Sequence, residues 1–236
     1  MKAAFHPACS RGLADHGWLY SRHTFSFADY YHPERMGFGL LRVLNDDVVQ
    51  PGKGFGTHPH ANMEIISIPL QGALRHEDSL GSQHVIEAGD VQVMSAGTGV
   101  THSEYNASTE DEVNFLQIWI HPQQRDIQPR YAQRFFDAAD REDRFQLLVA
   151  PEADSDGLAI NQEAWLSLTR ISVGNTLEYE RRRAGTGVYL FVVDGDVKVA
   201  EHRLEPRDGL GLAGSAPIQL NAETPAEVLA IEVPLL

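Results

Sequence analysis

Gly54-Phe55-Gly56-Thr57-His58-Pro59-His60, followed farther along by His102-Ser103-Glu104, is the part of this chain that decides its fold. Residues two apart on a β-strand project from the same face. Two such strands facing each other would bring three imidazoles and one carboxylate around a single point. This donor set suits a borderline divalent metal ion. Two unrelated surface pairs are the alternative, but strand and turn signals flank both pairs and favour the metal site.

Apolar or alternating runs predict β-strands along the whole chain, and turn sequences such as Gln71-Gly72 separate them. Many short strands with glycine-rich turns are typical of a sandwich or barrel. The one stretch that predicts a helix is Arg130–Ala139. The predicted strands are Leu40–Leu44, Glu64–Leu70, Val91–Met94, Val113–Ile120, Gln146–Ala150, Trp165–Val173, Val188–Val193, Ile218–Leu220 and Val228–Val233.

A weak internal repeat of turn sequences indicates two similar domains, 1–128 and 129–236. The turns at Gly72 and Gly195 correspond in this repeat. Arg181 and Arg183 then stand where the first half has its histidine pair, and arginine has no lone pair for a cation. The repeat therefore predicts a metal in the first half only. Met1–Phe5 belong to no motif, and we expect them to cross over to the second half.

Composition narrows the classes of partner. The formal charge of −14 opposes binding to nucleic acid or to an anionic membrane. Hydrophobic content of 42% and charged content of 22% are ordinary for a globular protein, and no apolar run approaches the ~18 residues of a membrane span. The single Cys9 excludes an intrachain disulfide and suits a reducing compartment, so the expected location is cytoplasmic.

The first half resembles the cupin fold, a small double-sheet jelly roll. The first cupin motif corresponds to Gly52, the His58 and His60 pair, and Glu64; the second corresponds to 89–106. Ser95 stands where many cupins carry proline, and the spacing from Gly97 to His102 is longer than usual.

The chain also resembles a narrower group, the pirin family, and in particular its compact bacterial members associated with quercetin 2,3-dioxygenase activity. This resemblance is dense over residues 10–122 and thinner after 130. It rests on Asp15–Leu19, Arg22–Phe27, Gly37–Gly39, Leu44–Asp47, Gly54–His60 and Ser95–Glu104.

The resemblance implies an all-β bicupin, that is, two jelly-roll (double-stranded β-helix) barrel domains in tandem, with a metal in the N-terminal one. Typical cupins take their carboxylate ligand from the first motif, here Glu64, whereas pirins take it from the second, here Glu104. Strand periodicity excludes neither. The family pattern favours His58, His60, His102 and Glu104 as ligands, with Glu64 as a nearby buried, hydrogen-bonded carboxylate.

The same resemblance implies a dioxygenase that cleaves flavonols such as quercetin. The 3-hydroxyl oxygen of the flavonol would bind the metal, Glu104 would take its proton as the catalytic base, and the heterocycle would open with loss of carbon monoxide. One divalent ion is expected, Fe(2+) first, although Zn, Ni, Mn, Cu or Co would also suit the donor set. The expected partners are a small aromatic, flavonol-like substrate and dioxygen.

Two other classes remain open at this point. The first is a non-catalytic, metal-binding regulator that docks on a protein partner, although no docking segment is evident in the sequence. The second is a cupin isomerase or lyase acting on a small metabolite. A barrel mouth broad enough for a flat three-ring ligand would favour the dioxygenase.

Other histidines and aromatic residues are weaker candidates. We expect structural roles for His16 and His23, and His76 is a candidate for the barrel interior. Six aromatic side chains are candidates for an apolar pocket, with core packing expected for most of them: Phe25, Phe27, Phe38, Phe55, Phe115 and Trp119.

Overall fold

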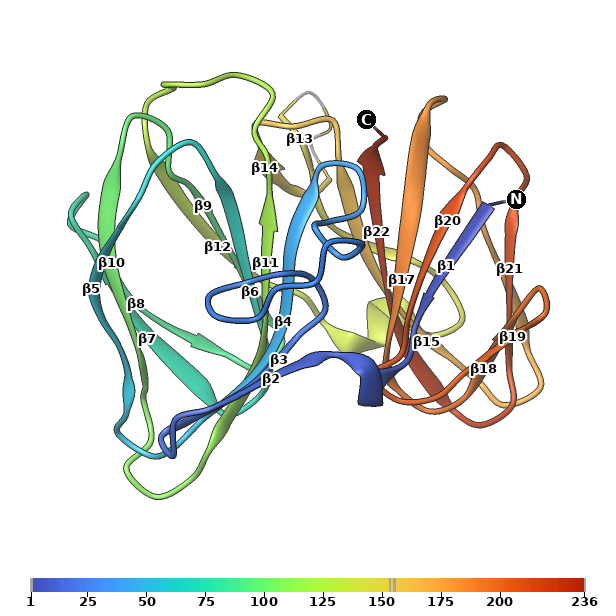
Figure 1. Cartoon of the computed structure of the whole chain (residues 1–236), viewed down its shortest axis with the longest axis horizontal. Coiled ribbons are helices and arrows are strands. Elements are labelled where there is room, and N and C mark those ends of the chain that lie inside the picture. Colours follow the sequence, from blue (N-terminus) through green and yellow to red (C-terminus); the bar gives the residue numbers. More distant parts are fainter. Residues whose placement is uncertain (1, 153, 155, 236) are drawn as a thin grey trace.

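The computed structural model describes residues 2–152, 154 and 156–235, and the chain forms two β-sandwiches side by side (Figure 1). The strands of the first are β2 (Gly12–Asp15), β3 (Leu19–His23), β4 (Leu41–Val49), β5 (Gly54–His60), β6 (Glu64–Gln71), β7 (Ala73–Asp78), β8 (Gln83–Glu87), β9 (Asp90–Ser95), β10 (Val100–Asn106), β11 (Val113–Ile120) and β12 (Arg130–Phe135). The strands of the second are β1 (Lys2–His6), β13 (Gln146–Pro151), β14 (Leu158–Ile160), β15 (Trp165–Ile171), β16 (Thr176–Tyr179), β17 (Thr186–Asp194), β18 (Val197–Val199), β19 (His202–Leu204), β20 (Gly209–Ala213), β21 (Ile218–Ala222) and β22 (Ala226–Pro234). Two 3-10 turns, η1 (Ala8–Ser10) and η2 (Ala138–Arg141), are the helical elements of the described residues.

Each sandwich pairs a seven-stranded sheet with a four-stranded one, so the expected all-β bicupin is confirmed. The seven-stranded sheets run β12-β9-β6-β11-β4-β3-β2 and β1-β20-β17-β22-β15-β13-β14. The four-stranded sheets run β5-β10-β7-β8 and β16-β21-β18-β19. The internal repeat is therefore present in the strand order as well as in the turns.

The turns at Gly72 and Gly195 show why the repeat is visible in the sequence. Both glycines have a left-handed backbone, with φ of 75° and 77°. A Cβ atom would meet the carbonyl oxygen of Glu112 at the first turn and of Pro225 at the second. Glycine is therefore required at the same turn of each half, because it has no side chain and tolerates positive φ.

The two halves share one apolar core between their seven-stranded sheets. Leu44, Ile66 and Ile118 of the first half belong to the same buried cluster as Leu166 and Ile231 of the second. The central strands are consequently buried on both faces, which explains their nearly continuous apolar sequences. The face of the first seven-stranded sheet that points away from this shared core lines the interior of the first sandwich.

Of two predictions about the ends of the first domain, one is confirmed and one is wrong. The predicted crossover of the N-terminus is confirmed, because Lys2–His6 pair with β20 (Figure 1); Met1 lies outside the described residues. The predicted helix at Arg130–Ala139 was wrong over its first part, where β12 pairs with β9. Pairing with β12 gives hydrogen-bond partners to the backbone groups at the edge of β9, and this gain outweighs the local helical pattern. The domain division after residue 128 stays a prediction, and β12 joins the first sandwich from beyond it.

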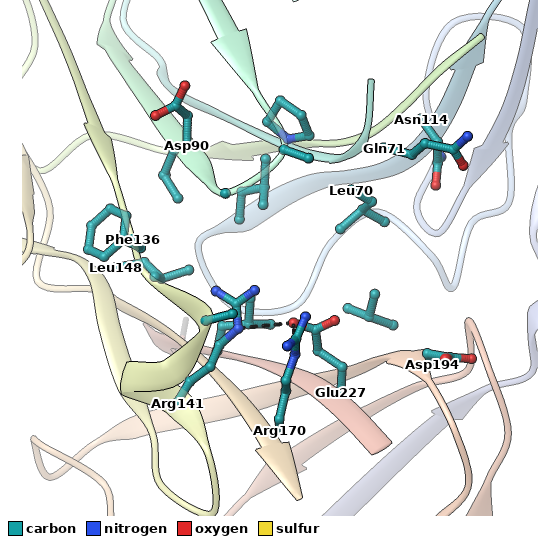
Figure 2. Close-up of a pocket in the computed structure, with 18 of the residues that line it drawn as sticks. Leu70, Gln71, Asp90, Asn114, Phe136, Arg141, Leu148, Arg170, Asp194 and Glu227 are labelled. Carbon is teal, nitrogen blue, oxygen red and sulfur yellow. Dashed lines mark ion pairs between the residues drawn. The ribbon is translucent and has the colours of Figure 1, made fainter. Parts of the chain in front are cut away.

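A cavity of about 540 Å³ lies between the halves (Figure 2). Arg141 and Arg170 both approach Glu227 there, with Nε–Oε1 distances of 3.1 Å and 3.5 Å. Leu70 and Leu148 contribute apolar surface from the two halves. None of the described histidines lines this cavity, and it is separate from the site described next.

Candidate metal centre

Three imidazoles converge inside the first sandwich from β5 and β10. His102 lies directly opposite His58 in the antiparallel pairing, and their Nε2 atoms are 3.1 Å apart. One ring nitrogen from each of His58, His60 and His102 lies within 4.8 Å of the others. Metal–nitrogen bonds of about 2 Å place adjacent ligand nitrogens about 3 Å apart, so this spacing fits a single ion.

The protonation of these rings also fits a cation. The Nδ1–H of His58 donates to the carbonyl oxygen of Gly56 at 2.8 Å, which leaves Nε2 with its lone pair. Burial, reinforced by the neighbouring imidazoles, lowers the pKa of His60 to about 4 and that of His102 to about 3. Both rings are therefore neutral near pH 7, which is the form that binds a metal.

A β-bulge in β5 brings Phe55 to the same side as the histidines. His102 pairs with His58, and Glu104 pairs with Phe55, so β5 carries one extra residue between the two pairs. Strict alternation would place Phe55 on the opposite face, because its spacing from His58 is odd. The bulge makes Phe55 part of the site wall, 6.5 Å from the His58 ring centroid.

Glu104 is buried and held by two side chains of the large sheet. Its Oε2 accepts a hydrogen bond from Gln117 Nε2 at 2.9 Å, and its Oε1 accepts one from Ser67 Oγ at 3.1 Å. A carboxylate oxygen of Glu104 also lies within 4.8 Å of ring nitrogens of His76 and His102. The carboxylate thus faces the histidines with its orientation fixed.

Glu64, the alternative carboxylate, has different neighbours. Its Oε2 accepts from Ser95 Oγ at 2.6 Å and from the backbone N–H of Asn161 in the second half at 3.2 Å. Burial raises its pKa, and these hydrogen bonds offset part of that effect. Among the described residues, Glu64 belongs to neither cluster of potential metal donors. Its contacts link the two halves.

The other histidines take several positions. His76 is fully buried, hydrogen-bonded through Nε2 to Asp78 Oδ2 at 3.0 Å, and its ring packs against Tyr131 of β12. His16 and His23, for which we expected structural roles, line the cavity beside the metal-donor cluster.

That cavity has a volume of about 470 Å³ and opens on His58, His60 and Glu104. Two edge-to-face aromatic pairs line it, Trp18 with Phe55 and Phe27 with Trp119. Three of the six candidate aromatic residues therefore line the pocket, and the others pack in or against the cores, as expected for most of the set. Five polar or aromatic residues without a predicted site role also line it. Trp18, Asn45 and Asp47 lie within the motifs that carry the family resemblance, whereas Ser21 and Gln117 lie outside them.

The corresponding interior of the second half is apolar. By strand order, β16 and β21 take the places of β5 and β10. The inward positions of β21 carry Ile218, Leu220 and Ala222, all buried in a second core cluster with Tyr179. Arg183, at a predicted histidine-equivalent position, donates its backbone N–H to the buried Glu232 instead.

Fold and site together define a bicupin with a histidine-rich centre in its first sandwich. The chain belongs to the pirin family: a model described as Pirin matches residues 6–120, and one described as Quercetinase C-terminal cupin domain matches residues 147–233. Among the described residues, no helix has the length and apolar character to cross a membrane.

Similar proteins match over nearly the whole chain. A quercetin 2,3-dioxygenase of Escherichia coli K12 is 43% identical over 231 residues, 96% of each chain. A pirin-like protein of Caulobacter vibrioides is 41% identical over 222 residues, 94% of this chain and 95% of its own. The crystal structure of a bacterial pirin from Escherichia coli in complex with nickel(II) has a TM-score of 0.94 at 40% identity and covers 100% of each chain.

Proposed function

We propose that this protein is a metal-dependent dioxygenase that cleaves flavonols such as quercetin with release of carbon monoxide. The observation that carries the proposal is the aromatic-lined cavity of about 470 Å³ that opens directly on the donor cluster. A cavity of this size suits a small, flat aromatic ligand. Similarity to quercetin 2,3-dioxygenases over the full chain supports the same reaction.

The proposed metal ligands are His58, His60, His102 and Glu104. Ring nitrogens of His58, His60 and His102 converge, and the fixed Glu104 carboxylate forms a second cluster with His102 and His76; the shared His102 supports combining Glu104 with the first three. Fe(2+) is the proposed ion, and the nickel(II) complex of the related bacterial pirin makes nickel the first alternative. When bound, the ion would supply Lewis acidity that lowers the pKa of the flavonol 3-hydroxyl.

The residues of the chain bind and orient the substrate, and one of them accepts its proton. Glu104 accepts the 3-hydroxyl proton on a carboxylate oxygen while Gln117 and Ser67 keep that group in place. Trp18, Phe55 and Trp119 cover the flat rings of the substrate and exclude water. The heterocycle then takes up both atoms of dioxygen, and one ring carbon leaves as carbon monoxide.

The experiment starts from protein purified without oxygen and stripped of metal. Each divalent ion is added back separately, and quercetin loss, oxygen uptake and carbon monoxide release are measured together. One carbon monoxide per oxygen and per quercetin, dependent on added metal, is the expected result. Stoichiometric metal binding without quercetin loss would overturn the proposed dioxygenase activity and favour the alternative of a metal-binding regulator.

We also propose a cytoplasmic location, which rests on the single, exposed Cys9.

A further inference from the structure

A row of five polar side chains crosses the inner face of the first large sheet. His23, Asn45, Gln117, Ser67 and Gln92 lie opposite one another on β3, β4, β11, β6 and β9. All five are more than nine-tenths buried. Polar groups in such a place are expected to be hydrogen-bonded, because burying an unpaired group costs about 1–3 kcal/mol.

At one end of the row the protein supplies most of the hydrogen-bond partners, and among the described atoms there Gln92 Oε1 is without one. Ser67 and Gln117 donate to Glu104, and Gln92 Nε2 donates to Ser67 Oγ at 3.4 Å. The other end lacks partners. Asn45 Oδ1 and His23 Nδ1 are buried and have no hydrogen-bond partner within the described residues. Both residues line the same cavity as the metal-donor histidines.

The groups around Asn45 and His23 favour binding of a neutral hydrogen-bond donor. Among the described residues, no lysine or arginine lines the cavity, so its wall offers an anionic group no direct ion pair. Asp47, which accepts from the Ser21 hydroxyl, adds acceptor oxygens next to Asn45. Burial lowers the pKa of His23 to about 4, so its ring is neutral and can accept or donate.

We infer that Asn45 and His23 form a second polar subsite, which binds a phenolic hydroxyl of the substrate while its 3-hydroxyl faces the metal-donor cluster. The inference rests on the proposed function and specifies it: the preferred substrates are polyhydroxylated flavonols. Asn45 Oδ1 accepts the phenolic proton as a hydrogen bond, and the ring nitrogen of His23 contacts the same hydroxyl. Flavonols without such a hydroxyl leave both groups unpaired and bind less tightly.

The test is equilibrium binding to metal-loaded protein without oxygen, so that no turnover occurs. Quercetin is compared with 3-hydroxyflavone, which keeps the chelating hydroxyl and carbonyl but lacks the other hydroxyls. Wild-type protein should bind quercetin about tenfold or more tightly, the scale of one hydrogen bond. Asn45→Leu should remove most of this preference by weakening quercetin alone, and His23→Phe should act in the same direction. Asn221→Leu, on the outer sheet of the second half, is the matched control and should leave both affinities unchanged.

Equal binding of the two flavonols by wild-type protein would overturn the subsite without any variant. A preference that survives in whichever variant folds with full metal content would overturn it too. No binding or cleavage of either flavonol by wild-type protein would instead refute the proposed function. The two failures are therefore distinguishable.

Discussion

Gln117 donates a hydrogen bond to Glu104 across the interior of the first sandwich, from Nε2 to Oε2 at 2.9 Å. Gln117 lies on β11 of the large sheet, whereas Glu104 lies on β10 of the small sheet with the histidines. The Glu104 carboxylate is therefore oriented by a residue of the opposite, seven-stranded sheet. This contact makes the large sheet part of the proposed metal centre.

Replacing Gln117 with leucine should weaken the centre without unfolding the protein. Groups that orient ligand side chains typically contribute 10- to 100-fold in metal affinity or activity. We expect a loss of about tenfold in kcat, with metal affinity reduced and the KM for quercetin less affected. Kinetics at saturating metal and a metal titration measure the two effects. Gln219→Leu, in the second half, is the control, and equal effects of both changes would argue against the role of Gln117.

Replacing His102 with alanine should abolish stoichiometric metal binding while the fold persists. His102 belongs to both clusters of potential donors, so its loss leaves neither complete. Metal content after dialysis, together with circular dichroism, measures both properties. The exposed His84→Ala should retain the metal. A His102→Ala protein with one ion per chain would refute the ligand assignment.

Glu232→Ala should destabilise the protein by about 3 kcal/mol. The carboxylate is fully buried, and its loss leaves several donors unpaired. These are the buried Tyr179 hydroxyl and the part-buried backbone N–H groups of Arg182 and Arg183, whereas Thr186 Oγ1 keeps its hydrogen bond to the Arg183 carbonyl oxygen. Urea unfolding measures the change, with Glu178→Ala as the exposed control. A difference below about 1 kcal/mol from that control would contradict the expected anchoring role.

Asp47→Asn should change how stability depends on pH. Burial raises the pKa of Asp47 to about 7 from an ordinary value of 3.8. The folded state therefore holds this proton more tightly, and the associated stability is present below pH 3.8 and lost as pH rises through about 7. The asparagine side chain cannot ionise, so the variant should gain about 1 kcal/mol or more relative to wild type between about pH 5 and pH 8. Urea unfolding at both pH values tests this, and a difference independent of pH would refute the raised pKa.

The sequence predicted the strands with long apolar runs, because β6, β11, β17 and β22 are buried on both faces. It missed β2 and β3, which are short and place polar groups such as Ser21 and His23 toward a cavity instead of an apolar core. The predicted helix failed because the open edge of β9 requires a partner, a constraint that local propensity does not contain.

The convergence of His58, His60 and His102 was predictable because same-face spacing is a local property of strands. Asn45 lies within the motif Leu44–Asp47, but no site role was assigned to it. Gln117 was not predictable, since a single amide inside the apolar run Val113–Ile120 has no periodic signal. Its presence in an otherwise buried strand is the clue that could have been used. The contacts of Glu64 depend on Asn161, 97 residues away, and only the tertiary structure brings them together.

In the proposed reaction, the metal and Glu104 together carry out flavonol cleavage. The direct test compares metal-loaded wild type, chelated wild type and metal-loaded Glu104→Gln by loss of the quercetin absorbance band with matching oxygen uptake. The glutamine keeps the shape and removes the basic oxygen. Turnover should therefore fall by about 10²-fold or more in the variant, the scale of a general base, and to the uncatalysed rate after chelation. Equal rates in all three samples would mean that quercetin oxidises without the protein's help, and would contradict the assignment.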